Sequence, residues 1–334
     1  MNRRTRRTLL VVGAVLVLLA LAIFLRSKAP PEAARLLPES DGIVYINFKP
    51  IRTFSHFKDL KPPDRAPDYQ EFVEATGVDW ENDLDQVAVA LHRMPDPKGP
   101  NGPVAYSMVL VGRLTGKKLN TWLDAHAGTR ELYDGHTIYN IASGDRTVRI
   151  TQIGYDMIGV SNAPTTEQIH SMLDRHRAAA LPFSGSSLLG RYYQEIPLLS
   201  IAWGMGQIGA PFSESGAIKI MGFSLPVEAD STFIASIRWA GSLHLRVVEI
   251  APTEAVAAEQ AASFATLVTM ARGLAGPLGD STANNGLKEL LKTAEVNQKK
   301  DRVVLTATVS PALFATDKNS STDQATPPPS GATK

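Results

Sequence analysis

Residues 131–160 read ELYDGHTIYNIASGDRTVRITQIGYDMIGV, and this stretch decides the fold class. It contains four short runs in which apolar and polar residues alternate, which is the period of a strand with two different faces. Asp134-Gly135, Ser143-Gly144-Asp145 and Gly154 separate the runs and supply the residues that tight turns need. The stretch therefore predicts a meander of antiparallel strands at 131–133, 136–141, 147–153 and 155–160.

The sequence on either side adds helices to this sheet. Upstream we predict strands at 42–48, 86–92 and 104–114 and helices at 68–75 and 117–126. Downstream we predict helices at 165–177 and 186–195. Antiparallel strands combined with helices in this way indicate an α+β fold.

From Leu198 the order of elements begins again. A lone strand at 198–203 is followed by further strands at 218–225, 233–239 and 243–250, a helix at 253–274, a helix at 287–294 and a strand at 302–309. The helix at 253–274 has one apolar side, formed by Phe264, Leu267, Val268, Ala271 and Leu274. We therefore expect a weak two-fold internal repeat of antiparallel sheets with helices on one face.

An unbroken apolar run extends from Leu9 to Leu25. A helix of this length covers roughly 27 Å, enough to span the core of a bilayer. We expect a transmembrane helix whose contacts with the lipid bilayer include Leu9, Val11, Val15, Leu18, Leu21 and Phe24.

The charges around the apolar run predict its orientation. Only Arg26 and Lys28 follow the run closely, whereas its N-terminal side carries Arg3, Arg4, Arg6 and Arg7. By the positive-inside rule, the N-terminus is then cytoplasmic and the rest of the chain extracytoplasmic. The expected location is the inner (cytoplasmic) membrane, with a single span and a periplasmic C-terminal domain.

A cleaved secretory signal begins in the same way, so removal of the segment is the alternative. Signal peptidase requires small residues just after the apolar core, but residues 24–31 read FLRSKAPP. We favour an uncleaved signal anchor, and a mature chain that starts near Ala29 would be the evidence for cleavage. The chain has no cysteine, which excludes a lipoprotein lipobox and disulfides.

The composition shifts along the chain suggest how it is divided. We expect a cytoplasmic basic segment (1–7), a signal anchor (8–25), a linker (26–35), a first α+β unit (36–196), a second α+β unit packed on the first (197–315) and a disordered tail (316–334). Beyond residue 28 the chain carries 28 Lys and Arg against 33 Asp and Glu, a net charge of −5. This balance argues against nucleic acid as a partner, because nucleic acid binding needs concentrated positive charge.

Two motifs invite a cofactor or metal hypothesis. Gly204 to Gly209 fits the dinucleotide pattern G-x-G-x-x-G, but the sequence that follows is a poor helix, which favours a flexible loop. Asp79, Glu81, Asp83 and Asp85 alternate as in a calcium loop, but Leu84 stands where that loop needs glycine. We favour a turn in which Asp79 caps a short helix, and we expect no cofactor.

Three further patterns concern catalysis or metal binding. Ser55 and Lys58 match S-x-x-K, but no K-T-G motif follows. Ser161, between a predicted strand and helix, resembles the serine of a nucleophile elbow whose last glycine is missing. His170 and Asp174 are one helical turn apart and lack a third metal ligand, which favours an exposed pair. The sequence therefore predicts no catalytic or metal site, and Ser161 is the best nucleophile available.

Several fold-forming motifs resemble a group of uncharacterised bacterial cell-envelope proteins. They are LLPESDGIVYIN (36–47), ATGVD (75–79) with DLDQV (83–87), and DMIGVSN (156–162) followed by a helix and SSLL (186–189). Such proteins begin with a membrane segment or signal and repeat an α+β unit, so the resemblance implies this architecture over residues 35–315. It implies no activity.

The leading functional hypothesis is a membrane-anchored extracytoplasmic protein that binds another envelope protein and has no catalytic activity. A second hypothesis is a carrier that holds a lipid or other apolar ligand between the sheet and the helix at 253–274. A third is an envelope hydrolase that uses Ser161 as its nucleophile.

Overall fold

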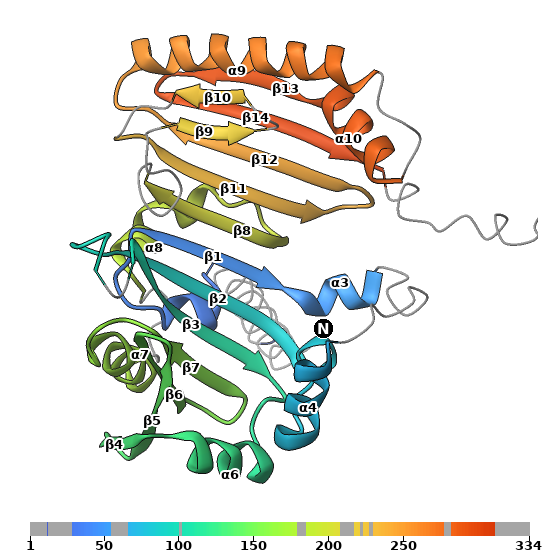
Figure 1. Ribbon diagram of the computed structural model, residues 1–334. Helices are drawn as coiled ribbons and strands as arrows, with labels where there is room; N and C mark the ends of the chain where they lie inside the picture. Colours follow the sequence, from blue (N-terminus) through green and yellow to red (C-terminus); the bar gives the residue numbers. More distant parts are fainter. Residues whose placement is uncertain are drawn as a thin grey trace, which may run out of the picture.

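The computed structural model describes residues 12, 29–54, 66–99, 102–178, 185–207, 217–220, 223–226, 230–276 and 282–310. Within these residues the chain forms one 12-stranded antiparallel sheet with helices packed on it, together with a separate two-stranded hairpin (Figure 1). The predicted α+β class and the antiparallel character of its sheet are confirmed.

The strands of the large sheet are β1 (Gly42–Asn47), β2 (Leu84–Arg93), β3 (Val104–Gly112), β4 (Thr129–Tyr133), β5 (His136–Ser143), β6 (Arg146–Gln152), β7 (Met157–Ser161), β8 (Ser200–Gln207), β11 (Thr232–Trp239), β12 (Leu243–Ile250), β13 (Glu295–Lys299) and β14 (Arg302–Val309). The hairpin consists of β9 (Ala217–Ile220) and β10 (Phe223–Pro226), where a single strand at 218–225 is predicted from the sequence. The predicted meander is confirmed as β4 to β7.

The order of the strands in the large sheet is β13-β14-β12-β11-β8-β1-β2-β3-β7-β6-β5-β4. Read outward from the β1–β8 pair, one half runs β1-β2-β3-β7-β6-β5-β4 and the other runs β8-β11-β12-β14-β13. In both halves a lone strand (β1 or β8) lies beside a hairpin (β2–β3 or β11–β12). The last strand of each half (β7 or β14) pairs with the outer strand of that hairpin. The two halves meet where β1 pairs with β8, so the sheet is continuous across the predicted boundary at residue 197.

The helices are α2 (Glu32–Arg35), α3 (Phe48–Phe54), α4 (Pro67–Thr76), α5 (Trp80–Asp83), α6 (Lys117–His126), α7 (Glu167–Arg177), α8 (Ser187–Tyr192), the 3-10 helix η2 (Tyr193–Glu195), α9 (Glu254–Ala275) and α10 (Thr282–Thr293). Their apolar residues recur every three or four positions, as in α7, where Ile169, Met172 and Leu173 are buried. In Figure 1, α9 lies along one end of the molecule and α6 lies at the opposite end.

Helices pack on both faces of the sheet, which corrects the prediction that they lie on one face. In β7, Met157 belongs to a core formed with α2, α7 and α8, whereas the next residue, Ile158, belongs to a core formed with α6. Successive side chains of a strand point to opposite faces, so these two cores lie on opposite sides. All five residues of β7 are buried, because a strand inside a sheet that is covered on both sides exposes neither face.

We name the two sides the α7 face, which carries Met157, and the α6 face, which carries Ile158. In the second half of the sheet, α9 packs on the α6 face through Phe264, which shares a cluster with Phe233 and Val303. Phe233 and Val303 lie on this face by register, because both align with Glu249 in neighbouring strand pairs.

The segment predicted as a linker, 26–35, includes part of the core. Residues 32–35 form α2, and Ala33 and Ala34 are fully buried against the α7 face. Small side chains at these positions let the helix backbone approach the strands closely. The predicted anchor at 8–25, except Val12, and the predicted tail at 316–334 lie outside the described residues. Within the described part of the chain, no helix combines the length and apolar character required to cross a membrane.

Candidate functional site

A partly exposed apolar surface lies on the α6 face, over four adjacent strands that include the β1–β8 junction of the two halves. β1, β8, β11 and β12 line a cavity of about 390 Å³ there. We call this cavity the apolar trough; the side chains that line it from the α6 face are Val44, Ile46, Ala202, Phe233, Ala235, Ile237, Leu245 and Val247, with Gly204 between them. None of these residues carries a charge or a polar side chain.

The trough is hollow because small residues occupy its centre. Gly204 is aligned with Val44 on one side and with Ala235 on the other, and Ala202 lies two residues away on the same face. Larger aliphatic and aromatic side chains surround this floor. Ala235 is exposed, and Ile237 keeps 37% of its surface exposed, so the apolar floor is open to solvent.

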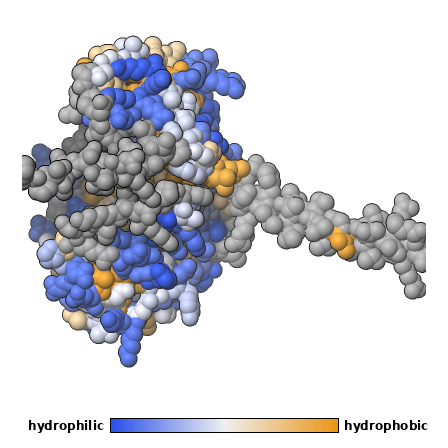
Figure 2. Space-filling view, turned by 90° about the vertical axis from the view of Figure 1, so that its right-hand side faces the viewer, coloured by the Kyte–Doolittle hydropathy of each residue, from blue (hydrophilic) through white to orange (hydrophobic). Residues whose placement is uncertain are grey.

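The trough lies beside α9, because Phe233 lines the trough and also contacts the cluster of Phe264. The sequence-based hypothesis instead placed an apolar ligand between α9 and the sheet. The inner side of α9 is filled, because Phe264 and Leu267 pack with Val303 and Val296. Met270 and Leu274 lie on the outer side of α9 and are about half exposed, although Leu274 was predicted to face the sheet. In Figure 2, weakly hydrophobic residues lie along the top of the molecule, where Figure 1 places α9. The open apolar space therefore lies beside this helix, and Phe233 borders both the trough and the cluster around Phe264.

A buried carboxyl group lies next to the trough. Glu249 is directly opposite Phe233 in the β11–β12 pair, and its side chain is completely buried. Its Oε1 accepts a hydrogen bond from the Ser231 hydroxyl at 2.9 Å, whereas its Oε2 has no hydrogen-bond partner among the described residues. Burial raises the pKa of Glu249 above its ordinary value, and the bond from Ser231 offsets part of this rise.

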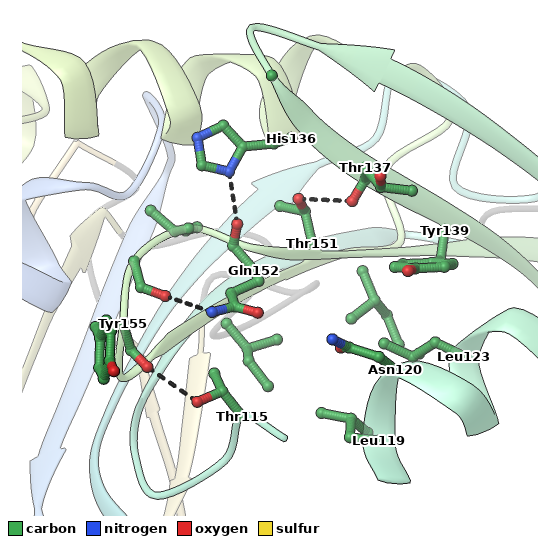
Figure 3. Close-up of a pocket in the computed structure, with 15 residues that line it drawn as sticks. Thr115, Leu119, Asn120, Leu123, His136, Thr137, Tyr139, Thr151, Gln152 and Tyr155 are labelled. Atoms are coloured by element: carbon green, nitrogen blue, oxygen red, sulfur yellow. Dashed lines mark hydrogen bonds between the residues drawn. The ribbon is translucent and has the colours of Figure 1, made fainter. Parts of the chain in front are cut away.

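A second cavity lies on the same face of the sheet, between α6 and the strands β5 and β6 (Figure 3). We call it the α6 pocket, and its volume is about 430 Å³. It is lined by Thr115, Leu119, Asn120, Leu123, Gly135, His136, Thr137, Tyr139, Ile150, Thr151, Gln152, Ile153, Gly154, Tyr155 and Ile158. The α6 pocket and the apolar trough share no lining residue.

Hydrogen bonds fix the walls of the α6 pocket. The Thr115 hydroxyl donates to the carbonyl of Tyr155 at 2.9 Å, and the Gln152 amide donates to the carbonyl of Gly154 at 3.0 Å. His136 Nδ1 lies 2.8 Å from the carbonyl oxygen of Gln152. A carbonyl only accepts, so Nδ1 carries the proton, and Nε2 of the neutral ring is an acceptor.

Ser161 lies in a buried polar network. Its Oγ is 3.1 Å from the Oγ of Ser107, which is 2.9 Å from Nε2 of His92. Both serines are fully buried, and neither cavity described above is lined by these three residues. Burial lowers the pKa of His92, although the nearby Asp41 acts in the opposite direction. Ser161 also ends a strand that pairs antiparallel with β3 and β6, unlike the parallel strand of a nucleophile elbow.

The glycines of the dinucleotide pattern belong to a strand. Gly204 and Gly206 are part of β8, which continues to Gln207 and pairs with β1 and β11. A phosphate site of this kind needs the glycines to lead into a helix N-terminus. Gly209 lies outside the described residues.

The acidic residues of the calcium-like pattern have structural partners. Asp79 caps α5 and accepts a hydrogen bond from the amide of Glu81 at 3.0 Å, as predicted. Asp83 accepts from the amide of Asp79 at 3.0 Å, and Asp85 forms an ion pair with Arg52. Through these contacts the carboxylates stabilise the turn that precedes β2.

His170 and Asp174 both contact Tyr133, and His170 also contacts Glu131. His170 Nε2 is 2.7 Å from a carboxylate oxygen of Glu131, and the His170 ring stacks on Tyr133. Asp174 accepts a hydrogen bond from the Tyr133 hydroxyl at 3.1 Å. Over the described residues, no group of three or more potential ligands has the geometry to hold a metal ion. Ser55 and Lys58 lie outside the described residues.

Sequence reasoning did not identify the trough or the α6 pocket. For the trough one signal was present, because β8 alternates Ser200, Ala202, Gly204 and Gly206 with larger apolar residues. A strand with small residues along one side leaves that side hollow. For the α6 pocket we find no comparable signal, because its residues come from three separate segments, 115–123, 135–139 and 150–158.

Comparison with known proteins gives no family. No protein-family model matches the sequence, and no curated protein sequence matches it. Among solved structures, crystal form III of TP0453 has a TM-score of 0.43 and 10% sequence identity, and the match covers 84% of this chain and 95% of that chain. Crystal form I has a TM-score of 0.42 and 11% identity, with 86% and 96% of the two chains covered.

Proposed function

We propose that this protein is a non-catalytic binding protein of the cell envelope and that its apolar trough holds an acyl chain or a similar apolar ligand. In this proposal the run from Leu9 to Leu25 is an uncleaved anchor in the inner membrane. Arg3, Arg4, Arg6 and Arg7 keep the N-terminus cytoplasmic, and the sheet lies on the periplasmic side. The bilayer is then both the attachment site and the nearest source of apolar ligands.

The observation that carries the proposal is the open apolar floor of the trough. Water-exposed apolar surface is unfavourable by roughly 25 cal/mol per Å², so a concave apolar surface favours an occupant. The volume of about 390 Å³ is within the range of small-molecule sites, which is roughly 300–1,000 Å³. An acyl chain in this position would cover Gly204, Ala235 and Ile237.

The shape of the trough favours a narrow apolar ligand over a second protein. Its floor is made of glycine and alanine, and its sides are made of larger residues such as Phe233 and Leu245. A protein interface centre is usually built from aromatic and arginine side chains, with polar groups at its rim. The residues that line the trough offer no hydrogen-bonding side chain on this face, which suits a ligand that needs none.

The hydrolase hypothesis receives no support from the site geometry. A nucleophile must reach its substrate, but Ser161 is fully buried and lies opposite Ser107 of β3. His92, the histidine connected to it through Ser107, is also buried. We therefore assign this network a structural role and keep the binding function as the proposal.

A photoactivatable palmitic acid tests the proposal in membranes that contain the full-length chain. After irradiation, the labelled peptides are identified by mass spectrometry. We expect label on β8, β11 and β12, with a loss of at least fivefold in Ala235→Phe, because phenylalanine fills the floor of the trough. Ala142→Phe is the matched control, since Ala142 is also an exposed strand alanine and lies outside the trough.

Other labelling patterns would contradict the proposal. Label that is equal in both variants, or confined to residues 9–25, would show that the trough takes no lipid. Cross-linking of this surface to a protein instead of the probe would favour an interaction with another envelope protein. The intact mass of the membrane-extracted chain tests the anchor separately, because a chain that begins near Ala29 would show cleavage.

A further inference from the structure

The α6 pocket presents a different chemistry from the trough. Its lining includes hydroxyl, amide, imidazole and phenol groups together with aliphatic side chains, but no Asp, Glu, Lys or Arg. A phosphate or carboxylate ligand is normally held by cationic side chains, and an ammonium ligand is normally held by acidic side chains. The composition of this pocket therefore favours an uncharged ligand that can form several hydrogen bonds.

Several polar groups in the pocket are left available by the internal hydrogen bonds. In Figure 3, Asn120 on α6 lies across the cavity from Gln152 on β6, with Tyr139 on the side of α6. The Gln152 amide nitrogen is used by Gly154, which leaves Oε1 as an acceptor, and Nε2 of His136 is a second acceptor. These groups come from α6, β5 and β6, so together they present both donors and acceptors to one ligand.

Apolar and aromatic groups complete the pocket. Leu119 and Leu123 face it from α6, and Ile150 and Ile158 face it from the sheet. Tyr155 lies at the edge of the pocket, and 95% of its surface is exposed. A sugar ring has hydroxyl groups at its edge and C–H groups on its faces, so it matches polar groups around an apolar floor and an aromatic ring at the entrance.

We propose that the α6 pocket is a binding site for a neutral saccharide unit. The proposal does not rest on the function of the trough, because the two cavities share no residue. The hydrogen bonds from Thr115 to Tyr155 and from Gln152 to Gly154 hold the loop 153–156 in place, so the pocket is already formed without a ligand. The Tyr155 ring covers one face of the sugar, and Asn120 and Gln152 bind its hydroxyl or acetamido groups.

The test uses the full-length chain in lipid nanodiscs and triacetylchitotriose as the probe, with saturation-transfer difference NMR as the measurement. We expect binding in the micromolar to millimolar range and a loss of at least fivefold in Gln152→Leu and in Tyr155→Ala. Gln298→Leu is the matched control, because Gln298 on β13 also donates its side-chain amide to a carbonyl two residues later. Its affinity should equal that of the unmodified chain.

The remaining outcomes decide against the proposal. Absence of saturation transfer to the probe at millimolar concentration would overturn it. So would an equal loss of affinity in Gln152→Leu and Gln298→Leu, because the effect would then not depend on the pocket. The deacetylated, positively charged trimer provides a further check, since tighter binding of this trimer than of the neutral probe would contradict an uncharged site.

Discussion

Tyr45 and Trp203 face each other across the β1–β8 pair and stack, with ring centroids 5.3 Å apart and an angle of 25° between the ring planes. The two residues belong to different halves of the sheet, and both are buried on the α7 face. Tyr193 adds an edge-to-face contact with Trp203 at 5.6 Å. The halves are thus joined by strand hydrogen bonds and by a shared aromatic core.

We expect Trp203→Ala to destabilise both halves together. Removal of a buried tryptophan typically costs roughly 3–5 kcal/mol, because a cavity remains in the core. Denaturant unfolding, followed by circular dichroism, should show a single transition with a lower midpoint. Trp122→Ala, in α6, is the comparison within one half. Two separate transitions in the Trp203 variant would show that residues 36–196 and 197–315 fold as independent units.

Gly112 is the position at which a single methyl group should be most damaging. A Cβ atom there would lie 2.0 Å from the carbonyl oxygen of Asp83, at the irregular start of the β2–β3 pair. Backbone cannot move away as easily as a side chain, so we expect Gly112→Ala to cost about 2–4 kcal/mol of the free energy of unfolding. Gly116→Ala is the control, since a Cβ atom at Gly116 meets nothing within 4 Å. Equal stability of the two variants would refute the predicted clash.

Glu249 should make the protein less stable as the pH rises. Its pKa is raised by burial in the folded state, so the folded protein retains the proton over a pH range in which the unfolded chain has already lost it. The favourable contribution is complete below the ordinary glutamate pKa and disappears as the pH passes the raised value. Glu249→Gln should therefore increase the stability at pH 7.5 by on the order of 1 kcal/mol and should not do so near pH 3.5. Thermal unfolding at both pH values would measure this, and an equal change at both would contradict it.

His92 should act in the opposite direction. Burial lowers its pKa, so the unfolded chain takes up a proton from roughly pH 6.5 downward, where the folded protein still excludes it. Stability is then lost as the pH falls through this range. We expect His92→Gln to lose less stability than the unmodified protein between pH 7.5 and pH 5.5, as measured by urea unfolding. An unchanged difference between the two pH values would show that His92 does not make this contribution.

The sequence predicted those elements whose signals are local. The meander from β4 to β7 was predicted correctly because its turns carry glycine or aspartate and its strands alternate. The cap at Asp79 was predicted for the same reason, since a cap depends on residues two or three positions away.

The errors concern features that depend on packing between distant segments. Helices were expected on one face, but β7 is buried on both sides. Its continuously apolar run from Met157 to Val160 is compatible with two covered faces, but it does not reveal which helices cover them. In α9, Leu274 is exposed while the neighbouring Ala275 is buried, because a helix so rich in alanine has little contrast between its sides. The trough is formed by four strands whose register is set by long-range pairing. The sequence of β8 alone could therefore indicate only that one side of this strand carries small residues.

The burial of α2 has a mechanical consequence. Ala33 and Ala34 of α2 are buried against the sheet, and only residues 29–31 precede α2 in this described range. Three residues extend at most about 10 Å. A force that enters the described part of the chain at residue 29 is therefore transmitted to α2 and the core of the α7 face with almost no slack.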